Sequence, residues 1–300
     1  MESVAVVAHE DKLATLPGTD PRELLRAALA ARGEPPPRCY ATTARDSGGE
    51  ATRAALAAGA RLVVVCGGDG TVSACAAVLA GTGVPMAVIP AGTGNLVAGN
   101  LGIPKDPAAA VEIALNGVDR PIDVGRMTEG VVVGMAGLGL DAAMVQDAPR
   151  SLKRRLGWPA YLVSLTRHLA DRGFTIAVEV DGHSTQYRHV RAVVIGNLGA
   201  LHGSLTLFPD AQADDGVLRV AILAPRSLFG WLVVATRLLR KRGRNGGSVQ
   251  RLHGQRIFIN GSRELRRESD GEALADGFGL DVVVEPAALM VRSDRNRDGG

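Results

Sequence analysis

The sequence predicts two domains, an N-terminal doubly wound α/β domain followed by a mainly antiparallel β-rich domain. The chain has 300 residues, which is enough for two domains of ordinary size. As far as about residue 120, short apolar runs alternate with helical segments, which is typical of parallel strands joined by crossover helices. Beyond that point strand patterns follow one another, and Asp181-Gly182 is a hairpin turn signal.

The first domain is expected to be an alternation of strands and helices. Asp20 is the expected N-cap of the first helix, with Pro21 at the first helical position. Gly59 and Asn116-Gly117 are expected to end two later helices. The expected strands cover residues 3–8, 61–66 and 84–89, and the expected helices cover residues 21–31, 49–58, 72–80 and 107–115.

The second domain is expected to consist mainly of strands, interrupted by two basic helical segments. The helical segments run from about residue 151 to 170 and from about residue 228 to 242. The polar residues 293–300 are expected to form a disordered tail. The expected strands cover residues 131–135, 174–180, 186–197, 217–223, 256–259 and 280–284.

Composition excludes several classes of protein. No apolar run approaches the roughly 18 residues of a membrane span, and the N-terminus lacks the basic and then apolar pattern of a signal peptide. Cys39, Cys66 and Cys75 are scattered and odd in number, so they indicate neither a disulfide framework nor a zinc site. A reducing, cytoplasmic location fits this cysteine usage.

Positive charge is concentrated in the middle of the sequence. Residues 1–149 hold 11 Lys and Arg against 16 Asp and Glu, residues 150–267 hold 20 against 7, and residues 268–300 hold 3 against 8. A basic middle section indicates an anionic partner surface, either a bilayer or a nucleic acid. No nucleic-acid motif accompanies the charge, and the cations alternate with apolar residues, so we expect a membrane surface and no nucleic acid.

Both basic segments carry aromatic residues near their cations. Trp158 and Tyr161 follow a Lys-Arg-Arg run, and Trp231 precedes Arg237. Aromatic rings and long cationic side chains suit a helix that lies at a membrane interface, because they span the boundary between lipid and water. The alternative is that each helix packs an apolar stripe on a sheet and exposes a solvated basic face.

The sequence Gly67-Gly68-Asp69-Gly70-Thr71 directly follows a β-branched run and precedes an expected helix. Glycines let the backbone bend tightly and approach a ligand, and bare N–H groups at a helix N-terminus form a cradle for phosphate oxygens. Asp69 repels phosphate, so it is better suited to orient a metal, a water or a hydroxyl group. The alternative is that Asp69 caps the helix that follows it.

A second glycine-rich turn, Pro90-Ala91-Gly92-Thr93-Gly94-Asn95, follows the next expected strand. The carboxyl ends of parallel strands meet at one edge of a sheet, where open α/β sheets bind ligands. We therefore expect both turns to lie at that edge and to form one phosphate site. Each turn alone is equally well explained as a tight connection between a strand and a helix.

Five ordered motifs resemble those of the diacylglycerol kinase catalytic domain family, which includes bacterial lipid kinases and sphingosine and ceramide kinases. The first combines the two glycine-rich turns with Leu101-Gly102-Ile103-Pro104. The others are Ile122-Asp123-Val124-Gly125, Gly137-Leu138-Gly139-Leu140-Asp141-Ala142, Pro209-Asp210-Ala211 with Asp214-Asp215-Gly216-Val217-Leu218, and Asp270-Gly271-Glu272.

The resemblance implies an ATP-dependent lipid kinase that transfers the γ-phosphoryl group to the hydroxyl of diacylglycerol or a related lipid. It implies an NAD kinase-like and diacylglycerol kinase-like nucleotide domain at residues 1–122, to which residues 280–300 return. It also implies a lipid-substrate β-sandwich domain at residues 123–279. ATP and Mg²⁺ are the implied cofactors, and a peripheral place at the inner membrane surface and a homodimer are further expectations.

The resemblance also implies roles for individual residues. Glu272 is the implied general base, although Asp270-Gly271 alone indicates a hairpin turn with Glu272 merely solvated. Asp69 is the second catalytic candidate. The residues implied to contact ATP are Gly67, Gly68, Asp69, Gly70, Thr71, Gly92, Thr93 and Thr43, with Thr42 as the alternative to Thr43.

Two kinds of metal position are implied. A structural Mg²⁺ site is implied at Asp215, with Gln212 and Val217 as neighbours, and an ordinary turn acid is an equally good interpretation of Asp215. The catalytic metal is expected to arrive with ATP and to meet Asp69, with Asp123 and Asp141 as further candidates.

The sequence departs from the family pattern at several positions near the nucleotide. Ser73-Ala74 stands where an Asn-Glu pair is frequent, and Gly99 stands where an arginine is frequent. Lys12 is a candidate to supply the missing positive charge. These departures keep two alternatives open, a soluble NAD kinase-like enzyme and a catalytically weak sensor that binds lipid or nucleotide.

Overall fold

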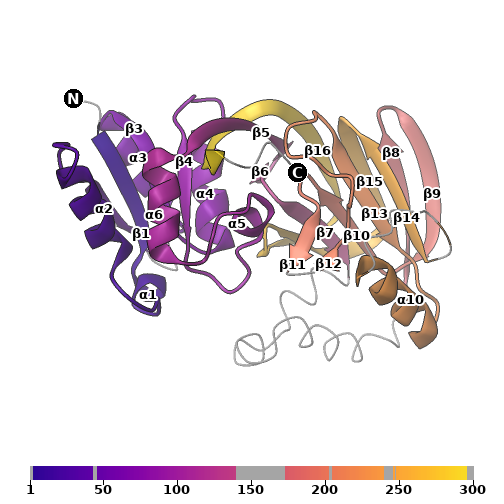
Figure 1. Cartoon of the computed structure of the whole chain (residues 1–300). Helices are drawn as coiled ribbons and strands as arrows, with labels where there is room; N and C mark the ends of the chain where they lie inside the picture. The colour runs from indigo at the N-terminus through magenta and orange to yellow at the C-terminus, as the bar shows by residue number, and fades with distance from the viewer. Residues whose placement is uncertain are drawn as a thin grey trace. The chain divides into compact units, whose positions relative to one another are not determined.

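The computed structural model describes residues 3–42, 46–139, 173–202, 205–239, 246 and 248–295 (Figure 1). Its chain divides into two compact units. Unit 1 consists of Met1–Val124 and Pro286–Gly300, and unit 2 consists of Gly125–Glu285. The chain leaves unit 1 along strand β5 (Val118–Met127) and returns to it along strand β16 (Glu272–Ser293).

Unit 1 contains a parallel sheet whose strands follow the order β16-β4-β3-β1-β2. The centre of β3 is completely buried, because its apolar residues face helices on both sides of the sheet. The strands are β1 (Ser3–His9), β2 (Arg38–Thr42), β3 (Ala60–Gly67) and β4 (Met86–Pro90). The helices are α1 (Glu10–Leu13), α2 (Pro21–Ala30), α3 (Gly49–Ala57), α4 (Asp69–Leu79), α5 (Leu96–Asn100) and α6 (Pro107–Asn116).

Two helices begin with the same sequence signal, an aspartate N-cap followed by a proline. Asp20 accepts a hydrogen bond from the Arg22 N–H at 2.9 Å ahead of Pro21, as the sequence predicts for α2. Asp106 accepts one from the Ala109 N–H at 2.9 Å at the start of α6. Helix α4, by contrast, begins at Asp69 rather than at residue 72, so the second half of the first glycine-rich turn is already helical.

Unit 2 is built from antiparallel strands. Strand β10 lies between β7 and β13, and the long strand β15 pairs with β7, β8 and β16. Besides the ends of β5 and β16, the elements are β6 (Gly130–Val132), β7 (Met135–Gly139), β8 (Phe174–Val180), β9 (His183–Val190), β10 (Ala192–Gly196), β11 (Ala200–His202), β12 (Leu205–Thr206), β13 (Leu218–Leu223), α10 (Leu228–Leu239), β14 (Val249–Gly254) and β15 (Arg256–Ser269).

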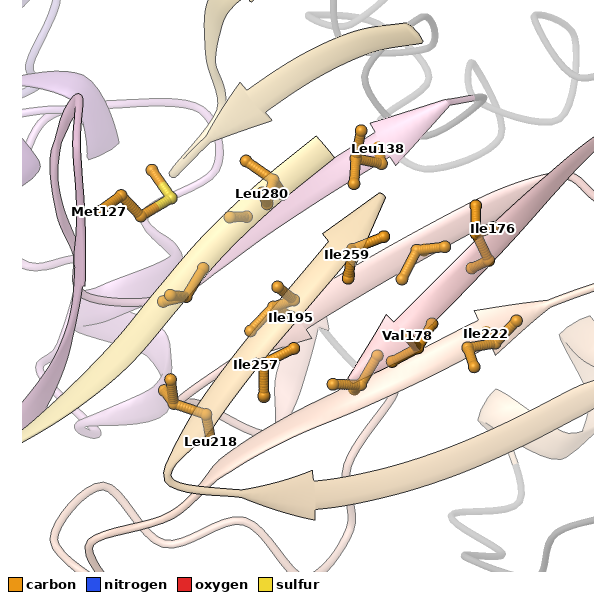
Figure 2. Packing of buried hydrophobic residues seen from close by; sticks show 14 of the residues in the cluster. Met127, Leu138, Ile176, Val178, Ile195, Leu218, Ile222, Ile257, Ile259 and Leu280 are labelled. Atoms are coloured by element: carbon orange, nitrogen blue, oxygen red, sulfur yellow. The ribbon is translucent and has the colours of Figure 1, made fainter. Parts of the chain in front are cut away.

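The core of unit 2 is formed by the inward residues of these strands. Leu138, Ile195, Ile222 and Ile257 come from four different strands and meet in one buried cluster (Figure 2). Strand β15 shows the underlying alternation, because Ile257 is buried whereas Phe258 is 42% exposed. Sheet register is fixed by this pattern, since a slip of one residue would turn the apolar set toward water.

Several boundaries differ from the sequence prediction. The strand expected at residues 131–135 is two strands, β6 and β7, separated by a bend at Val133 and Gly134. The strand expected at residues 186–197 is likewise divided into β9 and β10. The basic segment near residues 151–170 lies outside the described residues. Within the ranges described, no helix is long and apolar enough to cross a membrane.

Candidate active site

The two glycine-rich turns of unit 1 pack directly against each other. They follow β3 and β4, which are neighbours in the sheet with Gly67 opposite Pro90. The Ala91 N–H donates to the Gly67 carbonyl oxygen at 2.8 Å. A Cβ atom on Gly92 would lie only 2.7 Å from Gly68 Cα, so the close approach of the two backbones requires glycine. Both turns therefore lie at one edge of the sheet, as expected from the sequence.

Thr71 packs against the buried side of the first turn. Its side chain is buried against Gly67, where an added Cβ would lie 2.6 Å from Thr71 Cβ. Gly68 is the N-cap of α4 and has no side chain that could cover the helix end. The first N–H groups of α4 have no partner within the helix and carry the positive end of its dipole. This geometry suits the oxygens of an anion.

Asp69 connects the two turns through a hydrogen bond. Its Oδ1 accepts from the Leu96 N–H, the first of α5, at 2.5 Å. Burial raises the pKa of this carboxyl, and the N–H groups of Leu96 and Asn95 and the charge of Lys12 oppose that rise. The alternative prediction, that Asp69 caps its own helix, is wrong because Gly68 is the N-cap of α4 and the Asp69 carboxylate holds the start of α5.

Asn95 fixes the shape of the second turn. Its Oδ1 accepts from the Gly92 N–H at 2.9 Å, and its Nδ2 donates to the Gly92 carbonyl at 2.8 Å. The residue is buried and has a φ of 51°, a left-handed conformation that asparagine tolerates. Thr93 lies between Gly92 and Asn95 in the sequence and is exposed. The sequence places Asn95 at a loop position that favours function but assigns it no contact, and the structure shows that it holds the second turn in shape.

Lys12 brings a positive charge to the turns. It lies on α1, directly after β1, and its Nζ occupies the space that a Cβ atom on Gly68 would need. An ammonium group beside a bare backbone and a helix N-terminus strengthens the local preference for an anion. The suggestion that Lys12 supplies charge near the first turn is therefore supported by its position.

The other residues predicted near the nucleotide have different surroundings. Thr42 is buried at the end of β2, and its hydroxyl donates to the Asp46 carbonyl oxygen. Asp123 is buried, and its Oδ1 accepts from the Ala287 N–H at 2.8 Å, which fastens the returning strand to β5. Thr43 and Asp141 lie outside the described residues.

In unit 2, Asp270 and Gly271 form the hairpin turn between β15 and β16. Both have positive φ, 48° and 82°, and the flanking residues Ser269 and Glu272 are paired. Asp270 is 2% exposed, and its carboxylate accepts hydrogen bonds from the backbone N–H groups of Val133, Gly134 and Met135 at 2.8–2.9 Å.

Glu272 is exposed at the first position of β16, directly after this anchored turn. The hairpin turn at Asp270-Gly271, which the sequence offers as the alternative to a catalytic loop, is therefore the local structure. A hairpin does not remove the catalytic interpretation, because an exposed carboxylate on a rigid turn is accessible to a substrate. Glu272 belongs to unit 2 and Asp69 to unit 1, so their convergence on one substrate stays a prediction.

The residues predicted to hold a structural Mg²⁺ do not fit a cation. The Asp215 carboxylate and the Val217 carbonyl oxygen both accept hydrogen bonds from the guanidinium of Arg219. Gln212 is exposed. The part of the chain that the structure describes holds no cluster of three or more His, Cys, Asp or Glu residues suited to a metal. The sequence pattern did not show that a buried arginine faces the same oxygens.

Comparison with known proteins identifies the class. Residues 19–127 match the family described as the diacylglycerol kinase catalytic domain, and residues 134–293 match the YegS C-terminal NAD kinase beta sandwich-like domain. The chain therefore belongs to the diacylglycerol kinase catalytic domain family, and the predicted resemblance and fold class are confirmed.

Individual relatives place the chain among lipid kinases. It is 32% identical over 238 residues to a diacylglycerol kinase of Bacillus subtilis (strain 168), covering 77% of this chain and 78% of the relative. It is 35% identical to a Pseudomonas aeruginosa (strain PAO1) protein named "Probable lipid kinase YegS-like", over 90% and 89% of the two chains. A crystal structure of a diacylglycerol kinase from Bacillus anthracis str. Sterne has the same fold, with a TM-score of 0.75, 21% identity and 98% coverage of each chain. Membership in this kinase family implies the use of ATP.

Proposed function

We propose that this protein transfers the γ-phosphoryl group of ATP to the hydroxyl of diacylglycerol or a closely related lipid. The observation that carries the proposal is the packing of the two glycine-rich turns, with Gly92 against Gly68 and Lys12 beside them. Family membership supports the kinase chemistry, and the names of the relatives support a lipid acceptor.

The two turns provide the elements that a triphosphate needs. The N–H groups of Gly70 and Thr71 and the ammonium group of Lys12 would bind phosphate oxygens, and Thr93 would contact them from the second turn. Asp69 is the carboxylate that would meet a Mg²⁺ ion carried in by ATP, and such an ion neutralises phosphate charge. Its hydrogen bond to Leu96 N–H keeps the carboxylate in a fixed orientation.

Phosphoryl transfer to an alcohol further requires a proton acceptor. Glu272 would accept the proton of the lipid hydroxyl as the phosphoryl group arrives. The buried hydrogen bonds of Asp270 to Val133, Gly134 and Met135 hold the turn before it, so the carboxylate has a rigid support. Rigid placement matters because positioning contributes much of the rate of phosphoryl transfer.

The lipid would be taken from an anionic membrane surface. Phe229 near the start of α10 is 73% exposed, and Arg240, Lys241 and Arg242 follow that helix in the sequence. An exposed aromatic ring on a helix that is followed in the sequence by three cationic residues suits peripheral binding to a bilayer. We propose an inner-membrane surface in the cytoplasm as the place of action, with a homodimer as the assembly.

The proposal is tested by transfer of radiolabel from ATP to a lipid panel in anionic vesicles. Diacylglycerol or a close relative should be labelled, and Glu272→Ala should reduce the rate by about 10²–10⁴-fold, the usual effect of losing a general base. Glu264→Ala is the matched control, because Glu264 is an exposed acid of β15 in the same unit. If no lipid is labelled and ATP does not bind, the proposal is wrong.

A binding protein without turnover is the second candidate. Its motivating observation is Gly99, an exposed position where the family pattern favours an arginine near the nucleotide. Binding of ATP and vesicles without turnover, unaffected by Glu272→Ala, would favour this candidate. Labelling of NAD in the absence of lipid would instead favour a soluble nucleotide kinase.

A further inference from the structure

We propose that Arg219 takes the place of a divalent cation at the Asp215 turn of unit 2, so that the stability of this unit does not depend on Mg²⁺. The family resemblance implies a metal there, and the side chains around Asp215 contradict that implication. The inference concerns the fold of unit 2 and stands independently of the proposed lipid kinase activity.

The guanidinium of Arg219 contacts the oxygens that a metal would use. Its Nη1 lies 3.2 Å from Asp215 Oδ1 and 3.1 Å from the Val217 carbonyl oxygen. Its Nη2 donates to the Asp210 carbonyl oxygen at 2.9 Å and to Asp215 Oδ2. The Val217 N–H also donates to Asp215 Oδ1 at 3.2 Å. Three successive parts of the turn are thus joined by one cation from the protein itself.

Arg219 is held firmly in this place. It lies in β13, between Gly196 of β10 and His253 of β14, and only 7% of its surface is exposed. The planar fork of its guanidinium matches a carboxylate with two parallel hydrogen bonds. A dication at the same oxygens would have to approach a fixed, buried positive charge, which opposes its binding.

The arrangement has a testable consequence for the oxygen atoms that Arg219 contacts. If Arg219 is shortened, the Asp215 carboxylate and the carbonyl oxygens of Val217 and Asp210 lose their shared partner. These are hard oxygen donors of the kind that Mg²⁺ and Ca²⁺ prefer. Arg219→Ala is therefore expected to lower stability in chelator and to create a response to divalent cations that the natural chain lacks.

The experiment measures the thermal unfolding midpoint of the full chain without nucleotide, in chelator and in excess MgCl₂. The natural chain should show the same midpoint in both. Arg219→Ala should unfold at a lower temperature in chelator and recover part of the loss in MgCl₂, and adding Asp215→Asn should abolish the recovery. Arg256→Ala, which removes the exposed partner of Asp281, is the control and should show no Mg²⁺ response.

Two results would overturn the inference. One is a Mg²⁺-dependent rise in the natural chain that disappears in Asp215→Asn, because it would place the ion at this turn. This comparison needs no folded Arg219 variant. The other is a folded Arg219→Ala protein whose unfolding midpoint does not change with MgCl₂. In that case the oxygen atoms that the guanidinium contacts would not be a cation site.

Discussion

Removal of the Asp270 carboxylate should destabilise unit 2 more than any other acidic substitution in its hairpins. Three buried backbone N–H groups, those of Val133, Gly134 and Met135, depend on this single side chain. Hydrogen bonds to a charged acceptor contribute about 1.5–3 kcal/mol each, and their effects are not additive. We therefore expect Asp270→Ala to lower the free energy of unfolding by about 3–5 kcal/mol, part of which reflects the cost of a left-handed alanine.

A second substitution separates the backbone effect from the hydrogen bonds. Asp270→Asn keeps one acceptor oxygen and tolerates the φ of 48°, so we expect a loss of about 1–3 kcal/mol. Asp276→Asn is the matched control, because Asp276 is an exposed acid on the adjoining strand β16. Its effect should stay within about 0.5 kcal/mol.

Urea unfolding followed by circular dichroism measures the global effect, and hydrogen exchange of the amides at residues 133–135 measures the local one. Both variants should accelerate exchange at these three amides relative to the rest of β7. If Asp270→Ala costs less than about 1 kcal/mol and the three amides remain protected, the carboxylate does not hold this turn and the reasoning fails.

Three further predictions concern the glycine-rich turns. Gly92→Ala should push the turns apart and weaken ATP binding, measured by calorimetry, by about tenfold or more. Gly49→Ala is the control and should leave ATP binding unchanged, because the nearest atom to its added Cβ is 3.8 Å away. Equal affinities of the two variants would contradict the close packing of the turns. Burial raises the pKa of Asp69 in the folded protein above its ordinary 3.8. The free energy of unfolding of the natural chain, minus that of Asp69→Asn, should therefore fall as pH rises from 3.8 through the folded pKa. A rise of this difference over the same pH range would contradict the raised pKa. Gly99→Arg meets open space and should tighten ATP binding a few-fold over Gly99→Ala; equal binding by the two variants would place residue 99 away from the phosphates.

Local signals in the sequence predicted much of unit 1. Asp20-Pro21 marks a helix start by residue type alone, because capping and a fixed φ act within one turn of the chain. The start of α4 at Asp69 was missed, because Asp, Gly and Thr are weak helix formers and look like loop residues. Packing against the second turn, rather than intrinsic propensity, is our explanation for their helical backbone.

The partners of Asp215 and Asp270 could not be predicted from spacing. An acid before a glycine is compatible with a metal loop, a turn or an ion pair, and an arginine four residues later does not by itself show which of these forms. Asp270 contacts residues about 135 positions earlier in the chain, which no local pattern reports. The Asp215 contact is local but depends on how the turn is folded, and the Asp270 contact comes from tertiary structure.

The return of residues 286–293 to unit 1 has a consequence for biosynthesis. Val291 pairs with Met86 and forms the strand next to β4, although all of unit 2 is translated between them. On the ribosome, β4 therefore remains an open edge, with unpaired backbone groups that invite aggregation, until residues 286–293 have been translated. Loss of residues 286–293 would therefore damage a sheet whose other strands, β1 to β4, are all translated before unit 2.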